Sequence, residues 1–296
     1  MIYKYTTYKW LPDIISTNSL HFSCPLDFND PFDSYIAIKK YEIPPEKIED
    51  ARIKTTKNQF VLSLTQSKDN ILMWSHYAKS HKGFCIGFKS NFKEFLESAE
   101  IAAEIKKDES IKDSLNLLQY QGLLFEKDCF DLKSISESNI EGMLLGSKVA
   151  SELFNENLLF YPLSKVDYSE NNDMPGKYDT LKHYKFIQGH HDGDARKEEA
   201  KIGVFLTTKN NLWGYEVEKR IITRRNWICQ GFITRKDDAN IKFKKSLLKE
   251  IIFGVNTPEL QKYCIKNLIE KNGYKDVEFY QAERKEDKYE LNINKI

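Results

Sequence analysis

Residues 70–88 read NILMWSHYAKSHKGFCIGF, and this stretch combines one helix with the strand on which the helix must pack. Five apolar side chains fall on one arc of roughly 160° of a helical wheel: Ile71, Met73, Trp74, Tyr77 and Ala78. Asp69 is the expected N-cap, and Gly83 is the expected left-handed residue after the helix. Residues 84–88 are almost entirely apolar, which is typical of a central strand. The stretch therefore predicts an aromatic helix covering a buried strand.

The charges balance over the whole chain but not along it. The 296 residues include 45 Lys and Arg against 44 Asp and Glu, so net charge gives no argument for a nucleic-acid or anionic-membrane partner. Residues 92–160 contain 14 acidic and 7 basic side chains, whereas residues 219–249 contain 10 basic side chains and two acidic ones. This uneven distribution is more informative than the total charge.

The five cysteines are scattered singly and form no C-x-x-C pair. Such an unpatterned, odd number is typical of a reducing compartment and argues against a disulfide framework or a zinc site. No apolar run reaches the ~18–20 residues of a membrane span. The chain opens directly into structured sequence without a signal-peptide core. We therefore expect a cytoplasmic protein with no membrane partner.

The hydrophobic pattern predicts an α+β fold of small mixed or antiparallel sheets, built from short strands flanked by helices. Strands are predicted at 2–6, 20–23, 60–64, 84–88, 163–168, 213–223, 251–255, 277–280 and 289–293. Further helices are predicted at 10–18, within 39–57, at about 196–208 and at 259–271. We expect one domain over residues 1–296, with a helical insertion at 92–160 and a long mobile loop at 169–199.

Two carboxylates two residues apart are the strongest candidates for chemistry. If residues 213–223 form a strand, its period of two places Glu216, Glu218 and Arg220 on one face. One interpretation is an exposed charged edge in which Arg220 is the counterion. The other is a carboxylate pair that orients a sugar and stabilises a developing cation. Both interpretations stay open at this point.

The remaining polar candidates carry less information. His76 lies on the polar flank of its helix and is either a structural histidine or a base. The run around His190 and His191 contains metal-ligand residue types, but it lies in a Gly-rich loop without a second ligand cluster, so we predict no metal site. The basic segment 219–249 either binds phosphates or forms the solvated face of a hairpin.

Four segments together resemble the bacterial domain of unknown function 2971 family. They are IYKYT at residues 2–6, LHFSCPLDFNDPFD at 20–33, LSLTQSKDNILMWSHYAKSHKGFCIGF at 62–88, and WGYEVEKR at 213–220 followed by LKEIIFGV at 248–255. Membership of this family implies related folds but no established activity.

A second resemblance is to the ADP-ribosyltransferase superfamily, in which a first strand carries His, Arg or Tyr, a second carries Ser or Thr, and a late strand carries Glu, often as E-x-E. The first strand here has neither His nor Arg. The resemblance implies an ADP-ribosyltransferase-like fold and NAD as the substrate. It implies as catalytic residues Tyr5, Ser23, Glu216 and Glu218. It implies as NAD-binding residues Tyr3, Lys4, Asn29, Asp30, Trp74, His76, Tyr77 and Arg220.

Three functions follow as hypotheses. The first is an intracellular ADP-ribosyltransferase-like effector, of toxin or phage-defence type, that cleaves NAD and modifies a protein or nucleic acid. The second is a non-catalytic sensing module whose cleft holds a nucleotide-like ligand. The third is a nuclease or nucleic-acid binder that uses the 219–249 segment. Two carboxylates in one cleft favour the first, a cleft without carboxylates favours the second, and a continuous basic groove favours the third.

Overall fold

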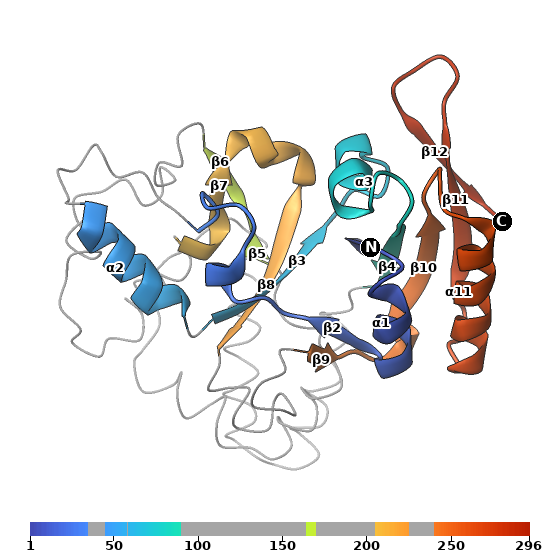
Figure 1. Cartoon of the computed structure of the whole chain (residues 1–296), viewed down its shortest axis with the longest axis horizontal. Coiled ribbons are helices and arrows are strands. Elements are labelled where there is room, and N and C mark those ends of the chain that lie inside the picture. Colours follow the sequence, from blue (N-terminus) through green and yellow to red (C-terminus); the bar gives the residue numbers. More distant parts are fainter. Residues whose placement is uncertain (35–44, 58, 90–163, 170–204, 225–239) are drawn as a thin grey trace, which may run out of the picture.

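The computed structural model describes residues 1–34, 45–57, 59–89, 164–169, 205–224 and 240–296. An eight-stranded sheet organises these residues. Its strands are β1 (Ile2–Thr6), β3 (Gln59–Thr65), β4 (Phe84–Phe88), β5 (Ser164–Lys165), β8 (Glu218–Arg224), β10 (Leu248–Phe253), β11 (Glu278–Arg284) and β12 (Leu291–Lys295). They are ordered β12-β11-β10-β4-β1-β3-β8-β5, and among these eight strands only β10 and β11 pair in parallel. Figure 1 shows the sheet crossing the molecule from β5 and β8 to β11 and β12.

Two small sheets and several helices complete the described part. One small sheet pairs β2 (Ser19–His21) with β9 (Asn240–Lys242), and the other pairs β6 (Asp167–Ser169) with β7 (Thr208–Asn210). The helices are α1 (Leu11–Thr17), α2 (Pro45–Thr56), α3 (Ile71–Tyr77) and α11 (Glu259–Lys271), with short 3-10 helices η1 (Pro25–Asp27), η5 (Asn211–Glu216) and η7 (Lys245–Leu247). The predicted α+β class is confirmed at the level of a mostly antiparallel sheet with a few helices.

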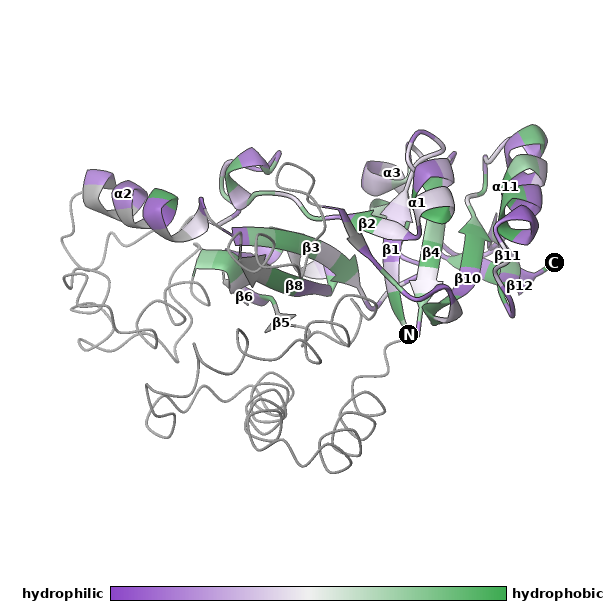
Figure 2. Ribbon diagram, turned by 90° about the horizontal axis from the view of Figure 1, so that it is seen from below, coloured by the Kyte–Doolittle hydropathy of each residue, from purple (hydrophilic) through white to green (hydrophobic). Residues whose placement is uncertain are grey.

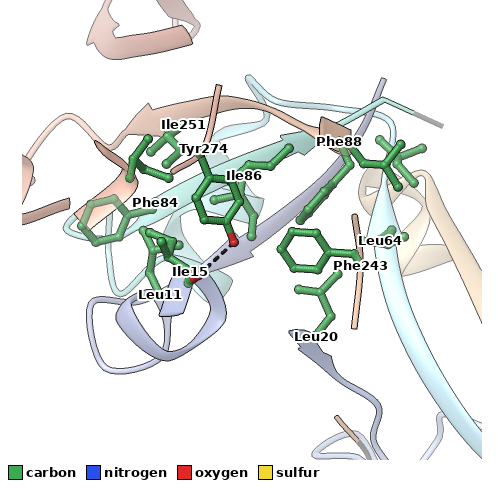
Figure 3. Close-up of a cluster of buried hydrophobic side chains, with 14 of the residues drawn as sticks. Leu11, Ile15, Leu20, Leu64, Phe84, Ile86, Phe88, Phe243, Ile251 and Tyr274 are labelled. Atoms are coloured by element: carbon green, nitrogen blue, oxygen red, sulfur yellow. Dashed lines mark hydrogen bonds between the residues drawn. The ribbon is translucent and has the colours of Figure 1, made fainter. Parts of the chain in front are cut away.

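The strand β4 lies at the centre of the sheet, as its apolar sequence predicts, and all five of its residues are buried. Phe84, Ile86 and Phe88 pack in a cluster with residues of α1 and α11 (Figure 3). Cys85 instead belongs to a second cluster that includes Trp74 of α3. Because successive strand side chains point to opposite faces, β4 supplies both halves of the core. Figure 2 shows α1 and α11 on the same side of the sheet.

The helix α3 forms where predicted, but its start differs from the prediction. Asn70, not Asp69, is the N-cap, and its side-chain oxygen accepts from the amides of Leu72 and Met73 at 2.9 and 3.2 Å. Asp69 accepts from the Ser67 hydroxyl instead. Ile71, predicted on the buried arc, is 37% exposed because it occupies the first turn at the outer end of the helix.

The role of Gly83 also differs from the prediction. The left-handed residues after α3 are Lys79, Ser80 and His81, and Gly83 does not have a positive φ. A Cβ atom at Gly83 would lie 2.3 Å from the Thr6 carbonyl oxygen. The glycine is therefore required by the close approach of β1, because any side chain would clash with its backbone.

The predicted strand at 213–223 was wrong in its first half. Residues 211–216 form η5, and the side-chain oxygen of Asn210 accepts from the amide of Leu212 at 2.9 Å. Val217 then adopts a left-handed conformation with φ 44°, and β8 begins at Glu218. The hydroxyl of Thr65 donates to the Glu216 carbonyl and holds this corner against β3. Apolar alternation alone could not reveal a 3-10 turn fixed by these polar contacts.

Several predictions fall on parts of the chain outside the described residues. They are the helical insertion at 92–160, the loop at 169–199 apart from Ser169, the loop around His190 and the centre of the basic segment at 225–239. Of the helix predicted at about 196–208, residues 205–207 are helical, and Thr208 already begins β7.

Candidate functional site

The strands β1 and β3 are neighbours in the sheet but pair over very little of their length, and a cavity lies beside them. These two strands pair at one position only, Tyr3 opposite Thr65, whereas β3 and β8 pair at seven positions. The cavity has a volume of about 160 Å³. Its walls come from β1, β3, β8, α3, η5, β7 and the loop after η1, through Tyr3, Lys4, Tyr5, Phe28, Asn29, Asp33, Ser63, Leu64, Thr65, Met73, Tyr77, Lys209, Glu216 and Glu218. The parting of the two strands therefore brings side chains from distant segments together.

Glu216 lies at the end of η5 and is 3% exposed. The hydroxyl of Tyr77 donates to its Oε1 at 2.5 Å, and the ammonium of Lys209 donates to its Oε2 at 2.6 Å. Asn70 of the α3 cap binds the carbonyl of Tyr215 at 3.1 Å, which ties η5 to α3. Glu216 is thus a buried carboxylate held from two sides.

Glu218 begins β8 and is held by an arginine on the same strand. Arg220 donates from Nε to Oε1 at 2.8 Å and from Nη2 to Oε2 at 3.0 Å. Arg220 also makes two hydrogen bonds to Asp33, at 3.0 and 2.7 Å, and is fully buried. The prediction that Glu216, Glu218 and Arg220 share a strand face holds for Glu218 and Arg220 only, because Glu216 belongs to η5. The alternative of an exposed charged edge is wrong, since all three side chains are buried.

Lys209 of β7 links the acidic groups of the site. Its Nζ lies 2.6 Å from Glu216, and 3.5 Å from oxygens of both Glu218 and Asp33. Lys209 and Arg220 therefore supply two positive charges against three carboxylates. A buried network of this kind is stable only if each member keeps its partners.

The two glutamates titrate in opposite directions. Burial raises the pKa of Glu216, and the neighbouring Glu218 adds to this, although Lys209 and Tyr77 partly offset it. Burial also acts to raise the pKa of Glu218, but Arg220 and Lys209 outweigh it and lower the pKa to about 2. Two neighbouring acids with separated pKa values are a common arrangement for one proton carrier and one permanent anion. Glu216 fits the first role and Glu218 the second.

Lys4 is the second cation of the cavity wall, beside Lys209. Its ammonium donates to the Ser63 carbonyl at 3.2 Å, across the gap between β1 and β3. Burial lowers the pKa of Lys4 to about 8, although Glu218 acts in the opposite direction. Burial also raises the pKa of Tyr5 and of Tyr77, so both phenols stay protonated at neutral pH.

Seven of the twelve residues predicted for the site line the cavity. They are Tyr3, Lys4, Tyr5, Asn29, Tyr77, Glu216 and Glu218. The other five do not line it. Arg220 is fully buried behind Glu218, and Trp74 is fully buried in the core. Ser23 forms a backbone bridge with Val61, Asp30 caps its own loop at Phe32, and His76 is exposed on α3.

Four polar residues of this site were not predicted from the sequence, namely Asp33, Ser63, Thr65 and Lys209. Ser63 was available from the pattern, because it lies in the strand predicted at 60–64, whereas Thr65 follows the predicted end of that strand. Asp33 and Lys209 carried no local signal, since they reach the cavity from a loop and from the edge of a two-stranded sheet. Only the tertiary structure reveals their proximity.

Within the described ranges, no three His, Cys, Asp or Glu side chains gather in a way that could hold a metal ion. Among the helices that the structure describes, none has both the length and the apolar character for crossing a membrane.

The fold and the site together define an α+β protein in which two neighbouring strands, β1 and β3, pair at one position only and a buried pair of carboxylates lines the cavity beside them. A family model, described as "Protein of unknown function (DUF2971)", matches residues 73–221, which is half of the chain. The chain belongs to this family, as the four sequence segments predicted. Searches of the curated proteins and of the solved structures found no match.

Proposed function

We propose that this protein is an ADP-ribosyltransferase-like enzyme that cleaves NAD and transfers ADP-ribose to a protein or nucleic acid. The observation that carries the proposal is the juxtaposition of three adjacent strands at one cavity. Tyr3 of β1 lies opposite Thr65 of β3, and Thr65 lies opposite Glu218 of β8. This order of residue types matches the strand pattern of that superfamily, with Ser63 or Thr65 in the place that we assigned to Ser23.

The size and walls of the cavity suit one ring of such a substrate. A cavity of about 150 Å³ accommodates a benzene-sized molecule, and this one measures about 160 Å³. Tyr3, Tyr5 and Tyr77 contribute aromatic groups to its wall, which favour a flat ring such as nicotinamide. The rest of a dinucleotide would extend out of the cavity.

The carboxylate pair fits the chemistry of this reaction. The bond between C1 of the ribose and the nicotinamide nitrogen breaks, and its electron pair leaves with nicotinamide. The cation that develops on the ribose is stabilised by a fixed anion, the role of Glu218. The acceptor then forms a bond to C1 and loses its proton, for which Glu216 is the base.

The pKa shifts support this division of roles. Glu218 stays ionised at every physiological pH, because its pKa is about 2. Glu216, with its raised pKa, exchanges protons more readily near neutral pH than an ordinary glutamate does. We place the enzyme in the cytoplasm as part of the same proposal, because Cys24, Cys85 and Cys264 are free thiols. Its action as a toxin or phage-defence effector is proposed by analogy only.

Incubation with NAD labelled in the adenylate part, with and without cell lysate, tests the proposal. We expect nicotinamide release, faster with lysate, and transfer of label to an acceptor. Glu218→Gln should lower the rate by at least ~100-fold, the effect of losing one preorganised charged group. Glu283→Gln, an exposed glutamate of β11, is the matched control and should retain the full rate. No release and no transfer by folded protein would overturn the proposal.

A second candidate function is a non-catalytic module that binds a nucleotide-like ligand. The observation that favours it is the saturation of the carboxylates by internal cations, since Arg220 takes both oxygens of Glu218 and Lys209 takes one of Glu216. Such pairing leaves fewer lone pairs for a ribose. Saturable binding of NAD without nicotinamide release would support this candidate against the first.

A further inference from the structure

A chain of aromatic rings leads from the cavity wall to the surface. It begins at Tyr77, which lines the cavity and binds Glu216. The Tyr77 and His76 ring centroids are 6.4 Å apart, those of His76 and Tyr215 6.3 Å, and those of Tyr215 and Trp213 6.0 Å. Two elements supply these rings, α3 and η5, and each successive ring lies within stacking or edge contact of the previous one.

The three outer rings of this series, His76, Tyr215 and Trp213, are accessible to solvent. His76 is exposed, and Tyr215 and Trp213 are partly exposed. Leu212, beside Trp213, is 80% exposed. These side chains form a partly apolar rim, the aromatic rim (His76, Trp213 and Tyr215), that continues the cavity outward.

The capacity of the cavity shows which part of a ligand the aromatic rim would meet. A volume of about 160 Å³ holds one ring and excludes a second. A dinucleotide whose first ring fills the cavity must therefore place its second base outside. The aromatic rim offers an exposed aromatic surface that ring contacts join to Tyr77 of the cavity wall.

We propose that the aromatic rim of His76, Trp213 and Tyr215 is a subsite for a purine base, the adenine of a dinucleotide whose other ring occupies the cavity. This inference rests on the proposed function, because it assumes a dinucleotide substrate. Aromatic side chains bind bases through their faces without requiring specific hydrogen bonds. The ring planes of Trp213 and Tyr215 are tilted by 41°, and those of Tyr215 and His76 by 35°, so these rings do not form parallel stacks with one another.

Trp213 is the ring whose loss should matter most. Its indole is the largest of the three, and the Lys209 ammonium lies 4.9 Å from the ring centroid. This contact holds the indole beside Glu216, because Lys209 is itself fixed by that carboxylate at 2.6 Å. The stacking surface is therefore anchored to the catalytic cavity and not to a separate part of the fold.

Calorimetric titration of the purified protein with NAD, with nicotinamide mononucleotide and with AMP tests the subsite. We expect Trp213→Ala to weaken binding of NAD and AMP about tenfold, the scale of one base stacked on one ring. Binding of nicotinamide mononucleotide, which lacks the adenine, should not change. Trp10→Ala is the matched control, since Trp10 is 53% exposed and is the N-cap residue of α1, not part of the cavity wall. Retained mononucleotide binding also shows that the variant is folded.

The outcomes separate this inference from the proposed function. Equal weakening of all three ligands, or no effect of Trp213→Ala on NAD and AMP, would overturn the purine subsite even if NAD is cleaved. AMP binding that depends on Trp213 in a protein that never releases nicotinamide would retain the subsite and overturn the enzymatic proposal. If none of the three ligands binds to the wild-type protein, the subsite is overturned as well.

Discussion

The guanidinium of Arg220 donates to both oxygens of the Glu218 carboxylate, at 2.8 and 3.0 Å, from two residues further along the same strand. Nη1 and Nη2 also donate to Asp33, and Nη1 donates to the carbonyl of Leu206. Arg220 is therefore a positioning residue that fixes Glu218 from behind, while the face of Glu218 toward the cavity stays open. The resemblance to the ADP-ribosyltransferase superfamily implied that Arg220 binds the ligand, whereas its side chain is fully buried and does not line the cavity.

Arg220→Met should strongly destabilise the protein, by about 3–5 kcal/mol, because it leaves Glu218 and Asp33 buried without their main partner. Urea denaturation at neutral pH measures the effect. Arg220→Lys should recover only part of the loss, since an ammonium cannot make the same two-point contact. Arg284→Met, at an exposed position of β11, is the control and should leave the denaturation midpoint unchanged.

Acid should weaken the fold through Glu218. Its pKa falls from an ordinary 4.5 to about 2 on folding, so its stabilisation is complete above pH 4.5 and is lost as pH falls towards 2. The shift corresponds to about 3 kcal/mol. Glu216 has the opposite effect on stability. Because folding raises its pKa, its contribution to the free energy of unfolding is complete below pH 4.5 and declines as the pH rises above that value.

Unfolding free energies measured from pH 2 to 6 test this. Wild type should lose stability below pH 4.5, and Glu218→Gln should lose most of that slope. A variant with the wild-type slope would contradict the low pKa of Glu218. Glu259→Gln, in an exposed position at the start of α11, should retain the wild-type profile.

How much the sequence could predict depends on whether an element is fixed locally. The strands β1 and β4 and the helix α11 have the predicted bounds, because their apolar periods and flanking turn residues are local features. The carboxylate pair was also recognisable in the sequence as E-x-E. The relative placement of its two side chains could not be predicted, because Val217 takes a left-handed conformation and interrupts the strand alternation between Glu216 and Glu218. Lys209 could not be predicted, since only the pairing of β6 with β7 and the turn of η5 bring it to Glu216.

Trp74 illustrates how an aromatic residue near a site can be structural. It is fully buried, its Nε1 donates to the Lys68 carbonyl at 3.0 Å, and its ring meets Tyr5 edge-on at 5.1 Å. Trp74→Ala should cost about 3–5 kcal/mol, the usual loss for a large aromatic side chain in a core. The denaturation midpoint measures this, with Trp10→Ala as the exposed control. An unchanged midpoint would contradict a core role.

Gly83→Ala should destabilise the protein although it adds a single methyl group. The new Cβ would lie 2.3 Å from the Thr6 carbonyl oxygen and 2.9 Å from that of Ala78, so backbone must move. Overpacking of this kind typically costs about 1–3 kcal/mol. Gly214→Ala provides the matched control, because nothing lies within 4 Å of the Cβ position there. Equal melting temperatures for the two variants would show that β1 can move away from Gly83 without cost.

Tyr77 offers the sharpest test of the role of Glu216. Its hydroxyl donates to Glu216 Oε1, and this hydrogen bond lowers the pKa of Glu216 against the effect of burial. Tyr77→Phe removes the hydroxyl and keeps the ring, so the pKa of Glu216 should rise further. If Glu216 must be ionised to accept a proton, the acid limb of kcat/KM for ADP-ribose transfer from NAD to its acceptor should move to higher pH.

The titration of Glu216 can also be followed without turnover, by carbon NMR of protein labelled at the glutamate carboxyl groups, with Glu216→Gln to assign the signal. Tyr280→Phe removes a comparable hydroxyl that donates to the exposed Glu278, and it should leave both the Glu216 titration and the rate profile unchanged. A higher pKa of Glu216 with an unmoved rate profile would mean that another group accepts the proton. An unmoved pKa would mean that the Tyr77 hydroxyl does not stabilise the ionised form of Glu216.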